Sequence, residues 1–332
     1  MPTLYVTEPG ARIEKEYRRI LVASRDEVVL LSVPLVHVTD VVIVGSAGVT
    51  TQAMLSLLDE GVSFSIISAS GKLRGRLLPP SEGNIFLRRR QYLRAADPAF
   101  CLPIAKGIAL GKLKNQRAFA RRLCRSHKDL QDSAINNITT AIKSVEISQD
   151  MDTLRGQEGQ GAKAYFRIFR AALNSNWSFE KRSRRPPADP TNALLSFGYG
   201  LLTQNIMTAL ELVGLDPYDG IFHADVYGRP ALALDLMEEF RALIVDSVVL
   251  TVVNKRILSP DDFDFNLDRG FILKQPAMKK FLLHYNARLQ TSAFHPLAKR
   301  AITYQKAFEV QAWQLRRVIE GKIDSYQAYL TK

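Results

Sequence analysis

The sequence predicts an α+β fold, with a small N-terminal β-rich domain over residues 1–82 and a larger all-α domain over residues 83–332. Short apolar runs alternate with turn-forming residues over the first 80 residues, as in a set of short strands. A proline-containing stretch at 77–84 then ends this alternation. From Phe86 onward, apolar residues recur at helical spacing.

The β-rich region holds runs of β-branched or apolar residues that favour strands. These runs are residues 4–6, 20–22, 28–33, 41–44 and 62–67. Between the last two, residues 51–60 have helical spacing, and Gly61 is placed to end that helix at its C′ position. We expect a small sheet domain with one helix, serving as scaffold or as dimerisation surface.

The remainder of the chain is expected to be helical after a linker at 77–84 (LLPPSEGN). Apolar periodicity predicts helices at 86–96, 103–126, 130–146, 158–174, 190–213, 231–253, 274–290 and 296–319. Prolines at 186, 187 and 190 separate two of these helices. We expect Asp189 to cap the helix that has Pro190 in its first turn.

Composition places the chain among basic proteins that bind polyanions. The 332 residues carry a formal charge of +12 with a pI of about 9.7, and 46% are hydrophobic. This charge indicates nucleic acid as the partner before an anionic membrane. Two cysteines give no disulfide framework or metal-binding spacing, and no apolar run is long enough for a membrane span. The expected compartment is therefore the cytoplasm.

The positive charge is concentrated in one stretch of the chain. Residues 72–128 contain 15 Lys and Arg but only two acidic residues, and a second basic cluster lies at 181–185. A single run of basic residues is more often a surface exposed to solvent. Two basic runs with so few acidic residues among them favour contacts with phosphates. The predicted nucleic-acid-binding residues are Arg88, Arg89, Arg90, Lys114, Arg117, Arg121, Arg122, Lys181, Arg182, Arg184 and Arg185.

Several short motifs carry no function. The run 107–112 (GIALGK) is one residue short of a phosphate-binding P-loop, and Leu113 stands where Ser or Thr would bind magnesium. The glycines at 45 and 48 lack the third glycine of a dinucleotide fingerprint. The chain has no HExxH, CxxC or GxSxG motif.

Residues 220–246 (GIFHADVYGRPALALDLMEEFRALIVD) combine a histidine with nearby carboxylates. His223 precedes a broken segment, and a helix is expected from Ala231 with Pro230 in its first turn. Asp235, Glu238 and Glu239 are spaced so that all three can approach one strip of the helix surface. Such a group can supply metal ligands.

Residues 155–170 (RGQEGQGAKAYFRIFR) place Glu158 at the start of a predicted amphipathic helix. Glycines at 156, 159 and 161 cost helix stability and therefore suggest close approach by another helix or a ligand. Tyr165 lies seven residues after Glu158 and shares its face. Taken alone, Glu158 is either a favourable charge at a helix N-terminus or a ligand.

Three motifs together resemble a known family, the CRISPR-associated integrase (endonuclease) that is the universal adaptation enzyme of those systems. They are RGQEGQGAKAYF from Arg155, PPADPTNALLSFGYGLL from Pro186, and the 220–246 segment, in that family's order and spacing. The β-rich start, the linker and the helical remainder resemble its two-domain layout. The likeness therefore covers nearly the whole chain.

The resemblance implies a divalent-metal site of Glu158, His223 and Glu238, the catalytic residues of the larger domain. It also implies that Asp235 and Arg241 lie close to this site, and that Asn192 and Tyr199 belong to a supporting helix. Two carboxylates and one imidazole suit Mn²⁺ or Mg²⁺ better than zinc. The family works as a homodimer through the β-rich domain, and two dimers are bridged by a small ferredoxin-like partner protein.

The function implied is insertion of short double-stranded DNA fragments into a CRISPR repeat, by attack of a 3′-hydroxyl on a phosphodiester. No protein nucleophile is then required. Two alternatives stay open. One is a general metal-dependent nuclease acting on branched DNA or RNA, and the other is a non-catalytic scaffold that binds nucleic acid through the basic region.

Overall fold

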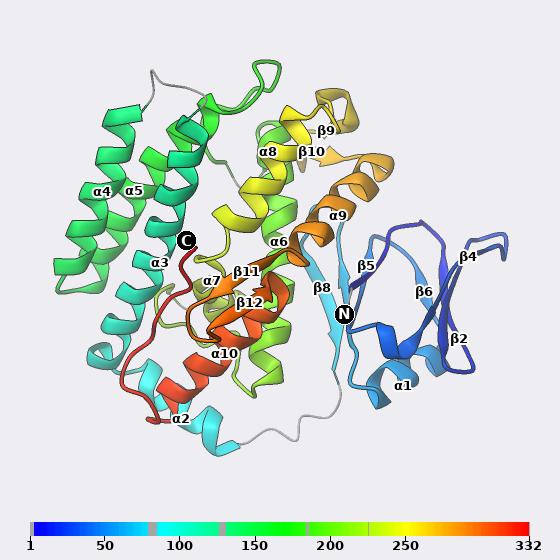
Figure 1. Ribbon diagram of the computed structural model, residues 1–332. Coiled ribbons are helices and arrows are strands. Elements are labelled where there is room, and N and C mark those ends of the chain that lie inside the picture. Colours follow the sequence, from blue (N-terminus) through cyan, green and yellow to red (C-terminus); the bar gives the residue numbers. More distant parts are fainter. Residues whose placement is uncertain (1–2, 79–84, 126–130, 184–185, 225, 332) are drawn as a thin grey trace. The chain divides into compact units, whose positions relative to one another are not determined.

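The computed structural model describes residues 3–78, 85–125, 131–183, 186–224 and 226–331 (Figure 1). The chain folds into two compact units, each built from separate segments. The first comprises Met1–Glu82, Arg184–Gln204 and Leu258–Ala287, and the second comprises Gly83–Ser183, Asn205–Ile257 and Arg288–Lys332. The α+β fold class is confirmed, with a strand-rich N-terminal region and a larger helical part. The division at residues 82 and 83 stays a prediction.

The first unit contains two four-stranded sheets. One has the order β1-β5-β7-β8, formed by Thr3–Val6, Asp40–Val44, Ser63–Ile67 and Leu73–Leu77. The other has the order β4-β3-β2-β6, formed by Val29–Pro34, Arg19–Ala23, Arg12–Glu16 and Gly48–Val49. In the first sheet β1, β5 and β7 are parallel, and β8 is antiparallel to β7. Aliphatic side chains from both sheets, including Ile13, Ile20 and Ile43, form one buried core.

Helix α1 (Thr51–Asp59) covers this core between β6 and β7. The Thr50 hydroxyl accepts a hydrogen bond from the Ala53 backbone nitrogen and so caps the helix start. Gly61 follows the C-cap with a φ of +67°, a conformation that glycine adopts without strain. Both ends of the predicted helix are therefore confirmed.

The later segments of the first unit contain α6 (Pro190–Leu212) as far as Gln204 and α9 (Gln275–Leu289) as far as Ala287. The Asp189 carboxylate accepts a hydrogen bond from the Asn192 backbone nitrogen at 2.7 Å, which confirms the predicted N-cap of α6. The β7–β8 turn lies directly on α6, because a Cβ added to Gly200 would come within 2.3 Å of the Gly71 carbonyl oxygen. This contact requires glycine at position 200.

The second unit is mainly helical (Figure 1). Its helices are α2 (Ile85–Ala95), α3 (Pro98–Cys124), α4 (Gln131–Ile147), α5 (Met151–Ala171), α7 (Ala231–Met237), α8 (Ser247–Asn254) and α10 (Tyr304–Ile319). Helices α3, α4 and α5 pack against one another. A Cβ at Gly161 of α5 would meet Leu113 of α3 at 2.5 Å and Ala141 of α4 at 3.0 Å. The expected close helix approach is thus confirmed at Gly161.

Several predicted boundaries are wrong. Helix α5 begins at Met151 with Asp150 as its N-cap, so Glu158 lies inside the helix and is not an N-terminal charge. The predicted helix 231–253 is divided into α7, a π-helical segment Ala242–Asp246, and α8. In the π segment the Asp246 backbone nitrogen donates to the Arg241 carbonyl, five residues back. Such segments recur at functional sites.

The predicted larger domain, residues 83–332, is also not entirely helical. Antiparallel pairs form between β9 (Phe263–Asn266) and β10 (Gly270–Leu273), and between β11 (Ser292–His295) and β12 (Arg300–Thr303). The second pair replaces the start of the helix predicted at 296–319, which begins at Tyr304. Each of these strands has only four residues, which is too short for a reliable alternation of apolar and polar side chains.

Most of the predicted linker, residues 79–84, lies outside the described residues. Among the helices that the structure describes, none combines the length and the apolar character needed to cross a membrane.

Candidate functional site

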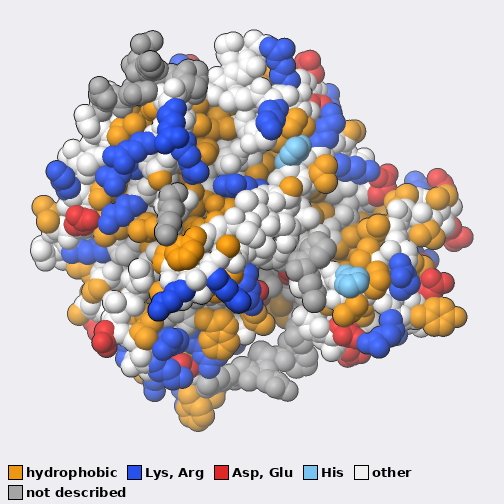
Figure 2. Space-filling view, viewed as in Figure 1, with side chains coloured by type: hydrophobic (Ala, Val, Ile, Leu, Met, Phe, Trp, Pro, Cys, Tyr) orange, Lys and Arg blue, Asp and Glu red, His pale blue; other side chains and the backbone are white. Residues whose placement is uncertain are grey.

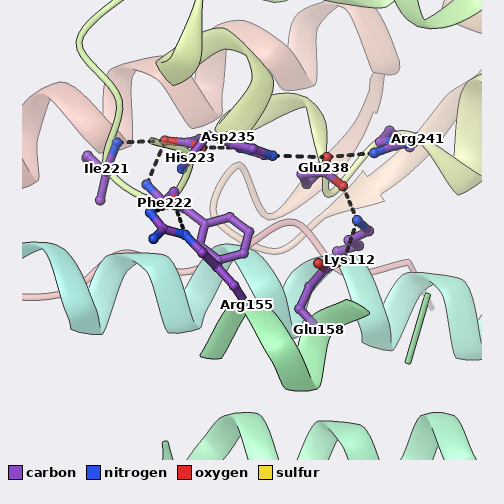
Figure 3. A network of polar contacts seen from close by, with 9 residues as sticks. All are labelled: Lys112, Arg155, Glu158, Ile221, Phe222, His223, Asp235, Glu238 and Arg241. Carbon is purple, nitrogen blue, oxygen red and sulfur yellow. Dashed lines mark hydrogen bonds and ion pairs between the residues drawn. The ribbon is translucent and has the colours of Figure 1, made fainter. Parts of the chain in front are cut away.

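Glu158, His223 and Glu238 come from three separate elements of the second unit (Figure 3). Glu158 lies in α5, His223 lies in the loop before α7, and Glu238 is the C-cap residue of α7. Lys112, from α3, lies between the two glutamates. A small polar network therefore joins residues that are far apart in the sequence.

The loop that carries His223 is held by the carboxylate of Asp235, which is fully buried. One oxygen, Oδ2, accepts hydrogen bonds from the backbone nitrogens of Ile221 and Phe222, at 2.7 and 2.9 Å. The other, Oδ1, contacts both the backbone nitrogen and the Nδ1 atom of His223, at 2.8 and 2.6 Å. Asp235 thereby fixes both the loop and the ring.

This pairing determines which ring nitrogen of His223 is available. When Nδ1 donates to Asp235, Nε2 of the neutral ring carries the lone pair. Nε2 lies 3.9 Å from Oε1 of Glu238, and 22% of the His223 side chain is exposed. In this tautomer His223 presents a nitrogen lone pair on the side of Glu238.

Arg155 also holds this loop, although it was not among the predicted site residues. Its Nε and Nη2 atoms donate to the Phe222 carbonyl oxygen at 3.0 and 2.7 Å (Figure 3). Because Arg155 lies three residues before Glu158 on α5, one helix turn both supplies Glu158 and anchors the His223 loop. This i, i+3 spacing is the only signal that could have revealed it.

Lys112 is the second functional residue that sequence reasoning missed, although it was counted in the basic stretch. Its Nζ atom is 2.6 Å from Oε2 of Glu238 and also forms an ion pair with Oε1 of Glu158. Only 7% of the residue is exposed. It is therefore part of the site and not of a solvated basic face.

Glu238 is buried, and burial by itself raises the pKa of a carboxyl group. Electrostatic interactions with Arg241, Lys112 and His223 outweigh this effect and hold the pKa of Glu238 well below its usual range. Arg241 donates from Nη1 to Oε1 of Glu238 at 2.7 Å. The carboxylate is thus ionised at neutral pH.

The donor set fits a divalent cation in its chemistry. Within the described residues, no three His, Cys, Asp or Glu side chains are grouped closely enough, as they stand, to hold one ion. However, Glu158 and Glu238 already point one oxygen each at a single cationic atom, the ammonium of Lys112. Two carboxylate oxygens and one imidazole nitrogen are donors that Mn²⁺ and Mg²⁺ accept.

The expectation that Glu239 shares a strip with Asp235 and Glu238 is wrong. Glu239 is fully buried and accepts hydrogen bonds from the Tyr326 hydroxyl, the Tyr329 backbone nitrogen and Nε2 of Gln311. Burial raises its pKa to about 7, and these hydrogen bonds only partly offset the effect. Its role is to hold the C-terminal segment.

The remaining predicted supporting residues have distinct places. Tyr165 of α5 is buried, and its hydroxyl donates to Oδ2 of Asp246 at 2.7 Å, which ties α5 to the π segment after α7. Asn192 is a residue of the first unit, where its side chain donates to Asp189 at 2.6 Å. Its support of the site stays a prediction.

Some of the basic residues are engaged within the protein. Arg90 donates to the Glu320 carbonyl oxygen at 2.6 Å, and Lys114 lies 3.3 Å from Glu146. Arg182 donates to the neighbouring Ser183 carbonyl. These contacts give each cation a structural role, so phosphate binding is not needed to explain them.

Other basic residues are more accessible. Arg89 in α2, Arg121 and Arg122 in the last turn of α3, and Lys181 are exposed. Figure 2 shows Lys and Arg side chains gathered over the helices of the second unit, with few acidic side chains among them. Arg88 is half-buried, and Arg117 donates to the Thr139 hydroxyl at 3.4 Å. Arg184 and Arg185 lie outside the described residues.

Comparison with known proteins links this chain to one family. Residues 4–287 match the family described as CRISPR associated protein Cas1. The chain is 37% identical to the CRISPR-associated endonuclease Cas1 3 of Thermus thermophilus, over 99% of this chain and 97% of the relative.

Two solved structures have similar folds. A casposase bound to its integration product covers 98% of this chain and 93% of its own, with a TM-score of 0.88 and 22% identity. A Cas6-RT-Cas1–Cas2 complex covers 98% of this chain and 36% of its own, with a TM-score of 0.83 and 25% identity.

Proposed function

The chain belongs to the Cas1 family of CRISPR-associated proteins, and we propose that it is a metal-dependent DNA integrase. In this proposal it joins the 3′-hydroxyl of a short DNA duplex to a phosphodiester within a CRISPR repeat. The carrying observation is that Glu158 and Glu238 direct oxygens at one cation, beside the nitrogen of His223. The relative from Thermus thermophilus is named an endonuclease, which fits chemistry at a phosphodiester.

The proposed metal ligands are Glu158, His223 and Glu238, with Mn²⁺ or Mg²⁺ as the ion. Such an ion neutralises a phosphate oxygen and favours in-line displacement at phosphorus. Asp235 keeps Nδ1 of His223 occupied, so that Nε2 is available as a ligand. Arg155 holds the same loop on α5, next to Glu158.

The charges of the site suit a phosphodiester substrate. Arg241 pairs with Glu238, so the carboxylate stays ionised despite its burial. No serine or cysteine intermediate is required, because the attacking oxygen belongs to the DNA. The exposed arginines of α3, Arg121 and Arg122, supply phosphate contacts that position the duplex without reading its sequence.

We also propose a homodimer formed through the β-rich region. Val29, Leu30 and Leu31 of β4 are about half exposed, and β4 lies at one edge of its sheet. An exposed apolar edge strand favours pairing with another chain. The similar Cas6-RT-Cas1–Cas2 complex supports a Cas protein as a second partner. We propose that this partner is a small ferredoxin-like adaptation protein that bridges two dimers.

The experiment that tests this function separates an integrase from a nuclease. Purified protein would receive a donor duplex, a supercoiled plasmid with a repeat, Mn²⁺ or Mg²⁺, and the small partner protein. The donor ends would carry either 3′-hydroxyl or dideoxy termini. Joined products are expected only with hydroxyl ends, while both donors bind equally because their phosphates are the same.

Equal plasmid nicking with both donors, without covalent joining, would refute the integrase and leave a general nuclease. DNA binding without joining or nicking, with each metal, would leave a non-catalytic scaffold. Replacing Glu158 by Gln is the matched control for the proposed site, since the change keeps the shape of the side chain.

A further inference from the structure

Lys112 is a buried lysine whose ammonium group is paired with two carboxylates. The residue is almost fully buried, and its Nζ atom contacts Oε2 of Glu238 and Oε1 of Glu158 (Figure 3). A buried charge is costly unless it is paired. The lysine and the two carboxylates therefore depend on one another.

The same interaction joins three elements that are far apart in the sequence. Glu158 belongs to α5 and Glu238 follows α7, and Lys112 comes from α3. Without a positive charge between them, the two carboxylates would repel each other in a buried setting. Lys112 thereby keeps both side chains directed at one point.

A divalent ion bound by these carboxylates would need the same oxygens. Mg²⁺ lies about 2.0–2.1 Å from its oxygen ligands. The Nζ atom of Lys112 already occupies the point at which the two oxygens converge, so an ion bound to both would be repelled by the ammonium. The lysine side chain is flexible, with a charge at the end of four carbons, so it can move away.

We propose that Lys112 is a positioning residue of the metal site, which holds Glu158 and Glu238 together and gives up its place when the metal binds. This inference rests on the proposed function, since it takes both carboxylates as metal ligands. Lys112 then has two opposing effects. It organises the site, and it weakens metal affinity by competing for the same oxygens.

The test compares Mn²⁺ binding by the wild-type protein, Lys112→Gln and Lys114→Gln, using calorimetry or the spin resonance signal of free Mn²⁺. Glutamine at 112 removes the charge but still donates hydrogen bonds. Lys114 is a matched control, because it lies on the same helix and pairs with Glu146. We expect Lys112→Gln to bind Mn²⁺ about tenfold tighter or more, and Lys114→Gln to stay within about twofold.

Thermal unfolding gives a second readout that does not depend on activity. Without Mn²⁺, Lys112→Gln should unfold at a lower temperature than the wild type, because its carboxylates are no longer paired. Saturating Mn²⁺ should remove this difference, since the ion replaces the missing charge. Folding of Lys112→Gln only in the presence of Mn²⁺ would be an extreme form of the same result.

The outcomes separate this inference from the proposed function. Wild-type protein that binds no Mn²⁺, or binds it equally after Glu158→Gln, would refute the metal site itself. Glu158-dependent binding that is not tightened by Lys112→Gln would overturn the role of Lys112 alone. If Lys112→Gln cannot be folded in either condition, Lys112→Arg decides, because it keeps the charge and must not bind Mn²⁺ tighter than the wild type.

Discussion

Replacing Asp235 by Asn is the sharpest test of how the site is held. The Asp235 carboxylate accepts four contacts, from the backbone nitrogens of Ile221, Phe222 and His223 and from the ring of His223. An amide has the same shape but only one accepting oxygen. Whichever way it turns, its NH₂ group faces two atoms that also donate.

The size of the effect follows from these bonds. A hydrogen bond to a charged group contributes about 1.5–3 kcal/mol, and the substitution loses two of them in a fully buried place. We expect a loss of about 3 kcal/mol in the free energy of unfolding. For a chain of 332 residues, this corresponds to a melting temperature lower by about 4 °C.

The chemical effect is separate from the loss of stability. If the amide donates to Nδ1 of His223, the ring proton moves to Nε2 and that nitrogen can no longer bind a metal. Changes in residues that orient metal ligands typically cost 10–100-fold, so strand transfer below the melting temperature should fall by about that factor. Donor DNA affinity should change by less than about twofold, because the phosphate contacts remain.

The assay measures melting, Mn²⁺ affinity, strand transfer and DNA binding on the same preparation. Asp268→Asn, at an exposed position in the β9–β10 turn, makes the same chemical change and should leave all four quantities unaltered. Wild-type melting and strand transfer in Asp235→Asn would show that Asp235 does not orient His223.

Three further predictions concern packing, pH and salt. Gly161→Ala should lower the free energy of unfolding in urea by about 1–3 kcal/mol, because the added Cβ meets side chains of α3 and α4. The Cβ added by Gly156→Ala meets nothing within 4 Å, so this variant should be more stable by up to about 1 kcal/mol. The opposite order of stability would refute this packing. Glu239 has a pKa of about 7 in the folded state against an ordinary value of 4.5, so the folded state stays protonated at a higher pH than the unfolded state. The free energy of unfolding should therefore fall by about 3 kcal/mol as pH rises from below 4.5 to above 7. Glu239→Gln should abolish this contribution to the pH dependence. Replacing Arg121 and Arg122 by Ala should reduce the slope of log K for DNA binding against log salt concentration by about 1.8, if each arginine contacts one phosphate. An unchanged slope would show that these arginines do not contact phosphates.

Local sequence features determined much of the architecture and the chemical identity of the site. Residues that cap or end a helix act on backbone groups only a few residues away. The helix end at Gly61 and the N-cap at Asp189 could therefore be predicted correctly. The candidate ligands Glu158, His223 and Glu238 were available because their residue types and surrounding motifs resemble one family. The strands β9 to β12 could not be predicted, since four residues each are too few to show a strong pattern.

Only the tertiary structure decided which of these side chains meet and in what state. Glu238 and Glu239 are adjacent in the sequence, yet one faces Lys112 and the other faces the C-terminal segment, because consecutive residues near a helix end point in different directions. Lys112 and Arg155 join the site through the packing of α3 and α5 beside the His223 loop. Such contacts depend on distances between elements far apart in the chain, and spacing along the sequence does not give those distances.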